Sequence, residues 1–148
     1  MAALAKPLIL LHLILLLTHP LLIKSAPARA EAEAEAEAKA LLKWKNSLSA
    51  FSSSLDSWSL TTNPCNWTGI VCSSTQTISQ INLPRSKLNG TLVHFDFSSF
   101  QNLTLLNLNY NSLSGSIPPS IANLPNLTSL DLSYNHFNGT LPEPAFTS

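Results

Sequence analysis

Apolar residues between positions 41 and 55 recur at the spacing of an α-helix. Separations of three, four, three and four positions place five side chains on one helical face: Leu41, Trp44, Leu48, Phe51 and Leu55. We therefore predict an amphipathic helix over residues 32–50, ended or kinked by the serine run at 52–54. Its apolar face is expected to cover the end of the structure that follows.

The stretch at the start of this helix, residues 30–38, alternates Ala and Glu. Both residue types favour helix and are poor in sheets, so the alternation does not indicate a strand. We interpret the stretch as a solvated helix start and assign it no function.

Further along the chain, a pattern of eight positions recurs after 24 residues. The first copy comprises Leu103, Leu106, Leu108, Asn111, Leu113, Gly115, Ile117 and Pro118, and the second comprises Leu127, Leu130, Leu132, Asn135, Phe137, Gly139, Leu141 and Pro142. A less regular copy lies 25 residues earlier and has Ser86 in place of the asparagine. This period, with the pattern L-x-x-L-x-L-x-x-N, is typical of a leucine-rich-repeat solenoid.

The repeat predicts an α/β solenoid of about two and a half coils, in which short parallel strands point leucines inward. The asparagines are expected to bond backbone groups of neighbouring coils, and the glycines to allow a bend where a Cβ would clash. These structural positions are Leu106, Leu108, Asn111, Gly115, Leu130, Leu132, Asn135 and Gly139.

The predicted domains are an export signal (1–30), an N-terminal cap (31–76) and repeats (77–148), the last divided into 77–99, 100–123 and an incomplete 124–148. One coil cannot bury its apolar interior alone, so a solenoid needs caps. The helix and the cysteine loop supply the first cap. We expect an uncapped C-terminal end and a truncated chain, with a true short protein as the alternative.

The longest apolar run, residues 8–23, follows Lys6 and precedes two A-x-A sequences. This arrangement is typical of an export signal, here cleaved after Ala28 or Ala30. An uncleaved membrane anchor is the alternative, although the run is short for a span of about 20 residues. We expect a secreted, extracellular chain with no membrane span after cleavage.

Two cysteines, Cys65 and Cys72, lie close together. In an exported chain an even cysteine count predicts a disulfide, with two free thiols as the alternative. Lys and Arg together equal Asp and Glu at 8 each, so no basic surface favours nucleic acid. We find no catalytic or metal-binding motif and expect no cofactor.

Two sets of polar residues are candidate sites. Five Asn-x-Ser/Thr sequons predict N-glycosylation, at Asn66, Asn89, Asn102, Asn126 and Asn138. Asn66, inside the cysteine loop, is expected to be occluded. The outward strand positions form a candidate ligand face with two tyrosines, which are common interface anchors but also common repeat residues. This face comprises Gln80, Asn82, Arg85, Asn107, Asn109, Tyr110, Asp131, Ser133 and Tyr134.

Three segments resemble a known family. Residues 65–72, Cys-Asn-Trp-Thr-Gly-Ile-Val-Cys, resemble the C-x-W-x-G-[VI]-x-C motif of the plant leucine-rich-repeat N-terminal domain, and residues 37–45 resemble its helix. Residues 113–118 are similar to the plant L-x-G-x-I-P segment. The chain thus looks like the start of the ectodomain of plant leucine-rich-repeat receptor-like kinases or receptor-like proteins.

In that family the ectodomain binds peptides, steroids or co-receptors, and a membrane span and a Ser/Thr kinase follow. The resemblance implies a recognition module for a protein or peptide ligand or a co-receptor ectodomain, without enzymatic activity of its own. Such a module would lie at the outer side of the cell membrane in a full-length receptor. The alternative is a short apoplastic inhibitor of microbial cell-wall enzymes, although such inhibitors have more repeats and a C-terminal cysteine cap.

Overall fold

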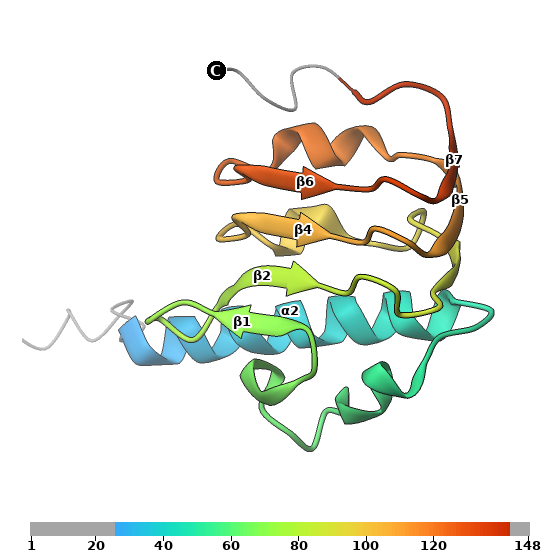
Figure 1. Ribbon diagram of the computed structural model, residues 1–148. Coiled ribbons are helices and arrows are strands. Elements are labelled where there is room, and N and C mark those ends of the chain that lie inside the picture. The colour runs from blue at the N-terminus through green and yellow to red at the C-terminus, as the bar shows by residue number, and fades with distance from the viewer. Residues whose placement is uncertain (1–25, 143–148) are drawn as a thin grey trace, which may run out of the picture.

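A computed structural model of the protein describes residues 26–142, which form stacked coils above one long helix (Figure 1). The predicted leucine-rich-repeat fold class is confirmed. Residues 1–25 of the predicted export signal and residues 143–148 lie outside the described range. The helix is α2 (Ala26–Ser47), and the strands are β1 (Ile70–Cys72), β2 (Ile78–Asn82), β3 (Asn89–Thr91), β4 (Leu105–Asn107), β5 (Ser112–Ser116), β6 (Ser129–Asp131) and β7 (His136–Asn138).

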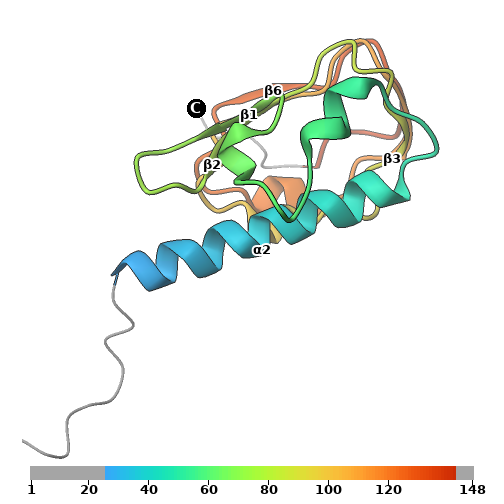
Figure 2. The ribbon, with the colours of Figure 1, turned by 90° about the horizontal axis from the view of Figure 1, so that it is seen from below.

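Short 3-10 helices connect these elements: η1 (Ser53–Ser57), η2 (Pro64–Asn66), η3 (Phe97–Ser99) and η4 (Pro119–Asn123). Figure 2 shows α2 running beneath the coils, with its N-terminal end extending past them. In the part of the chain that the structure covers, no helix combines the length and the apolar character that crossing a membrane requires.

Each coil contributes strands to two sheets, whereas the repeat pattern predicted only the first. In the first sheet, ordered β1-β2-β4-β6, the parallel partners follow the repeat, so Ile81 pairs with Leu106 and Leu106 with Leu130. In the second sheet, ordered β3-β5-β7, Gly90 pairs with Leu113 instead of its repeat equivalent Gly115. Equivalent residues on this side are therefore offset by two positions, or about 7 Å along the strand.

The N-terminal cap closes the first sheet with an antiparallel strand. Val71 of β1 pairs with Gln80 of β2, so β1 covers the edge that the first coil would otherwise expose. The predicted Cys65–Cys72 disulfide is confirmed and joins Cys65 of η2 to Cys72, the last residue of β1, with Cα atoms 5.4 Å apart.

Helix α2 differs from the predicted range of 32–50. It ends at Ser47 because the following backbone turns toward the second sheet, where Ser49 and Ala50 donate hydrogen bonds to the Asn89 carbonyl. Phe51 therefore leaves the helical stripe and is 38% exposed, and Lys45 lies over its ring.

The rest of the stripe is buried as predicted. Leu41, Trp44 and Leu48 pack against the first coil. Leu55, which lies in η1 and not in the helix, is also buried. Trp44 makes an edge-to-face contact with Phe95 at 5.0 Å between centroids and donates from Nε1 to the Thr91 carbonyl at 3.0 Å. The cap thus joins the coils through both apolar packing and a satisfied indole N–H.

Burial decreases toward the last described coil. Leu106, Leu108 and Leu113 are fully buried, but three core residues of the next repeat are only half-buried: Leu130, Leu132 and Phe137. Leu141 is 49% exposed. The apolar side chains of the last described coil are thus less buried than their equivalents in the coil before it.

Candidate binding face

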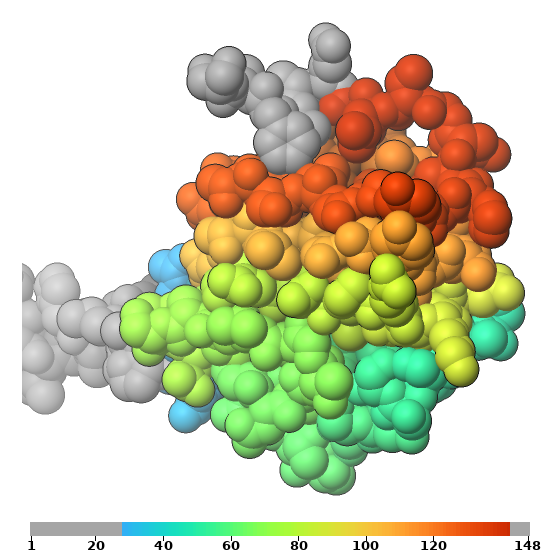
Figure 3. Space-filling view, viewed as in Figure 1, coloured from blue at the N-terminus to red at the C-terminus, as the bar shows by residue number. Residues whose placement is uncertain are grey.

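The outward side chains of β2, β4 and β6, with the residues that follow each strand, form one continuous surface, which we call the strand face. Figure 3 views the molecule from this side. Strand register and repeat spacing arrange the strand face in four rows: Gln80, Leu105 and Ser129; Asn82, Asn107 and Asp131; Pro84, Asn109 and Ser133; and Arg85, Tyr110 and Tyr134.

Three members of these rows were absent from the predicted ligand face: Pro84, Leu105 and Ser129. Leu105 and Ser129 are the register partners of Gln80 along the sheet, and Pro84 takes the place of Asn109 in the first repeat. The repeat spacing alone was enough to find them. Leu105 makes the first row less polar. Pro84 leaves the third row with one hydrogen-bonding side chain fewer.

Side-chain hydrogen bonds hold the middle rows in place. Asn107 Nδ2 donates to Asn82 Oδ1 at 3.0 Å, and Asn109 Nδ2 donates to Asp131 Oδ2 at 2.8 Å. The Ser133 hydroxyl and backbone N–H both donate to Asp131 Oδ1. These bonds to Ser133, followed by the bond from Asn109, lower the pKa of the Asp131 carboxyl, which therefore stays anionic at neutral pH.

The fourth row is a stack of one cation and two aromatic rings. The Arg85 guanidinium carbon lies 4.4 Å from the Tyr110 ring centroid. The Tyr110 and Tyr134 rings are parallel within 10° and 4.0 Å apart. They are 43% and 67% exposed, so this row offers ring surface and guanidinium donors to a ligand.

The backbone of the fourth row lies in the left-handed region. Arg85, Tyr110 and Tyr134 have φ values of 53°, 51° and 53°, which residues other than Gly rarely adopt. Hydrogen bonds between coils hold this conformation, because Arg85 N donates to the Asn109 carbonyl and Tyr110 N to that of Ser133. The three side chains are thus aimed in one direction by a repeated turn.

The asparagine that follows each tyrosine fixes that turn from inside. Asn111 Oδ1 accepts from Leu88 N at 3.0 Å, while its Nδ2 donates to the carbonyls of Leu83 and Leu108, both at 2.9 Å. Asn135 repeats the arrangement one coil later. Within residues 26–142, no buried side-chain polar atom lacks a partner, so the strand face rests on a satisfied and rigid support.

The repeat glycines act through their own backbone conformation, and a Cβ at either position would not clash with a neighbouring coil. Gly115 and Gly139 have φ values of 80° and 84°. A Cβ at Gly115 would make only an ordinary contact, 3.5 Å from Thr91 Cγ2, and one at Gly139 would meet no atom within 4 Å. Glycine is needed here because it adopts positive φ without strain.

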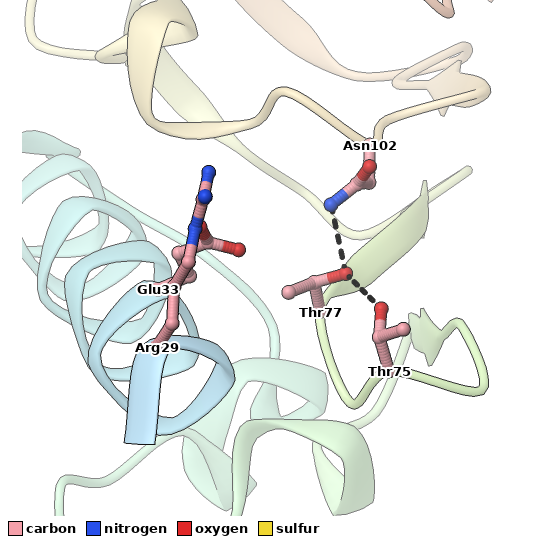
Figure 4. Close-up of polar contacts among 5 residues, drawn as sticks. All are labelled: Arg29, Glu33, Thr75, Thr77 and Asn102. Carbon is pink, nitrogen blue, oxygen red and sulfur yellow. Dashed lines mark hydrogen bonds and ion pairs between the residues drawn. The ribbon is translucent and has the colours of Figure 1, made fainter. Parts of the chain in front are cut away.

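The five sequons lie off the strand face. Asn66, Asn89 and Asn138 are exposed, so the expected occlusion of Asn66 is wrong. Asn102 is half-buried and donates from Nδ2 to Thr77 Oγ1 at 3.0 Å (Figure 4). Asn126 is exposed and donates to the Gln101 carbonyl at 2.8 Å.

Among residues 26–142, no group of three or more His, Cys, Asp or Glu side chains is placed to hold a metal ion. The acid on the strand face, Asp131, bonds only Ser133 and Asn109. This geometry suits contact with a ligand and contains no nucleophile paired with a base.

Comparison with known proteins gives two family matches. Residues 34–73 match the leucine rich repeat N-terminal domain, and residues 77–137 match the leucine rich repeat. A probable leucine-rich repeat receptor-like protein kinase of Arabidopsis thaliana is 42% identical over 90 residues, which are 57% of this chain and 8% of that protein. The chain therefore spans less than a tenth of that relative.

Solved structures show the same fold. The ectodomain of the Arabidopsis receptor kinase HAESA, in complex with an IDA peptide hormone ligand, has a TM-score of 0.64 and 33% identity, covering 75% of this chain and 18% of that one. The BIR3–SERK2 complex from Arabidopsis thaliana has a TM-score of 0.62 and 36% identity, covering 70% of this chain and 58% of that one.

Proposed function

Because residues 34–137 belong to the leucine-rich-repeat family and begin with its N-terminal domain, we propose that this chain is an extracellular recognition module. Its ligand is a peptide or another protein, and a co-receptor ectodomain is one such partner. The strand face carries the binding, and the part of the chain described here carries no catalysis.

The single observation that carries this proposal is the Arg85–Tyr110–Tyr134 row. Tyr and Arg are enriched among the residues that carry most of the binding energy at interfaces. Here they are exposed, stacked and held by a repeated backbone turn. Such preorganisation reduces the entropy lost when a ligand binds.

The relatives support the same assignment. The HAESA ectodomain was solved with a peptide hormone, and BIR3 and SERK2 were solved with each other. By this likeness we assign the module to an exported receptor-like kinase or receptor-like protein. Membrane attachment and kinase signalling are proposals for a whole receptor, and sequencing the transcript through the Ser148 codon tests them.

A peptide selection tests the binding role. The secreted chain is immobilised and panned with a library of random dodecapeptides, and the enriched peptides are measured on variants. A variant with Arg85→Ala, Tyr110→Ala and Tyr134→Ala should bind them at least about tenfold more weakly, because each hot-spot residue contributes about 2 kcal/mol.

The matched control lies off the strand face. Val93 and His94 are both exposed, so a Val93→Ala, His94→Ala variant should bind the peptides as the parent does. Equal weakening in both variants, or none in either, would place the binding surface elsewhere.

A further inference from the structure

One carboxylate of the alternating Ala/Glu stretch is buried, against the expectation that the stretch is solvated. Glu37 is 2% exposed, whereas Glu31 and Glu35 of the same helix are exposed. Glu37 Oε2 accepts a hydrogen bond of 2.8 Å from the backbone N–H of Ile78, the first residue of β2 and 41 positions away. The stretch therefore makes a specific contact with the first coil.

Among the described residues, α2 makes side-chain hydrogen bonds to the coils at two points. Glu37 reaches the first sheet at Ile78, and Trp44, two turns later, reaches the second sheet at the Thr91 carbonyl. Trp44 has no titrating group in this bond. Any change in the charge of Glu37 therefore acts on the first-sheet end of the helix alone.

In the part of the chain that the structure describes, no cation is paired with the Glu37 carboxylate. It borders a cleft of about 570 Å³, and the lining residues from the β1–β2 turn and from the η3 segment are neutral: Thr75, Ser98, Ser99, Gln101 and Asn102. Figure 4 shows Thr75 and Asn102 opposite Arg29 and Glu33 of α2. The charged groups that line the cleft belong to α2 itself. Arg29 is paired with Glu33 at 2.8 Å, and Glu33 repels a second negative charge.

A buried carboxylate with a single neutral donor is costly in its ionised form. Burial raises the pKa of Glu37 to about 7, although the hydrogen bond from Ile78 opposes the rise, and Glu33 adds to it. When the helix leaves the coil, the carboxyl enters water and returns to its ordinary value of 4.5.

We propose that docking of α2 on the first coil is linked to the uptake of one proton by Glu37. The cap then holds the first coil more tightly in mildly acidic surroundings than in neutral or alkaline ones. Between the unfolded value of 4.5 and the folded value near 7, the folded chain binds more protons than the unfolded chain. Stability is therefore fully present below the lower value and is lost as pH rises through the higher one.

The experiment measures the unfolding equilibrium constant of the secreted chain in urea at several pH values from about 5 to about 8. For the parent chain the constant should rise by up to about tenfold per pH unit and level off above about pH 7, since one proton is released. The Glu37→Gln variant keeps an acceptor for the Ile78 N–H but cannot ionise, so it should lose this slope. A Glu37→Gln variant with the parent's slope would overturn the proposal.

Glu35→Gln is the matched control on the same helix. Glu35 is exposed and paired with Lys39 at 2.6 Å, which lowers its pKa, so this variant should retain the slope. A second measurement needs no variant: the carbon-13 resonance of the Glu37 carboxyl in the parent chain should titrate near pH 7. A midpoint near the ordinary glutamate value would overturn the proposal whether or not Glu37→Gln folds.

Discussion

Tyr110 and Tyr134 stack face to face across neighbouring coils, with centroids 4.0 Å apart. The pair occupies the same position in two repeats, and Arg85 adds a guanidinium on the free side of Tyr110. Tyr110 is thus the central member of the row, in contact with both of the others. Its removal should separate the effects on binding from the effects on stability.

We predict that Tyr110→Ala lowers the free energy of unfolding by only about 1 kcal/mol, because the pair is exposed and stacked aromatics contribute about 0.5–1.5 kcal/mol. Binding of selected peptides should nevertheless fall about tenfold or more, since both neighbours lose their packing surface. Urea denaturation and a binding titration measure the two quantities. Tyr110→Phe keeps the stack and should retain both, and a large loss of stability in Tyr110→Ala would contradict a surface role.

A comparison of Gly69 with Gly139 separates the cost of a steric clash from the cost of a strained backbone. Both have positive φ, 82° and 84°. A Cβ at Gly69 would lie 2.5 Å from Leu83 Cδ2 and 2.7 Å from the Asn82 carbonyl oxygen, whereas one at Gly139 would meet nothing. We predict that Gly139→Ala costs about 1–2 kcal/mol of folding free energy from the left-handed conformation alone.

Gly69→Ala should cost at least about 3 kcal/mol, because overpacking against backbone is added to the same strain. Chemical denaturation of the two secreted variants gives the comparison. Equal costs would mean that the loop before β1 can move away from Leu83 without loss of stability, which would contradict the prediction.

The repeat made much of the first sheet predictable. The repeat spacing predicts the inward leucines and the asparagine bonds between coils. The disulfide of the cap follows separately, from the cysteine count. The second sheet was missed because β5, Ser-Leu-Ser-Gly-Ser, has little strand propensity. Its strands form through backbone pairing with the next coil, at a register that the repeat period does not contain.

The buried Glu37 was missed for a related reason. Its partner is a backbone N–H 41 residues away, and an Ala/Glu alternation contains no sign of such a contact. Phe51 shows the opposite error, because its spacing fits the helical stripe but backbone bonds to Asn89 end the helix first. Local periodicity identifies the faces of an element, whereas contacts between distant segments decide where it stops.

Asn111 is predicted to be a major determinant of stability. It is buried, accepts from one backbone N–H and donates to three backbone carbonyls. Asn111→Ala leaves these groups unpaired and should lower the free energy of unfolding by about 2–4 kcal/mol. Asn135→Ala should cost less, since Asn135 is only half-buried. Denaturation curves of both variants check the order, and a larger effect at Asn135 would contradict it.

The disulfide should stabilise the cap by restricting the unfolded chain. Cys65 and Cys72 close a loop with a sequence separation of 7, and the chain-entropy model gives about 2–3 kcal/mol for a loop of this size. We predict that Cys65→Ser together with Cys72→Ser lowers the free energy of unfolding by this amount, as measured by urea denaturation. Reductant should destabilise the parent chain to the same extent and leave the double variant unchanged. If reductant destabilised both equally, its effect would not come from this bond, and the prediction would be wrong.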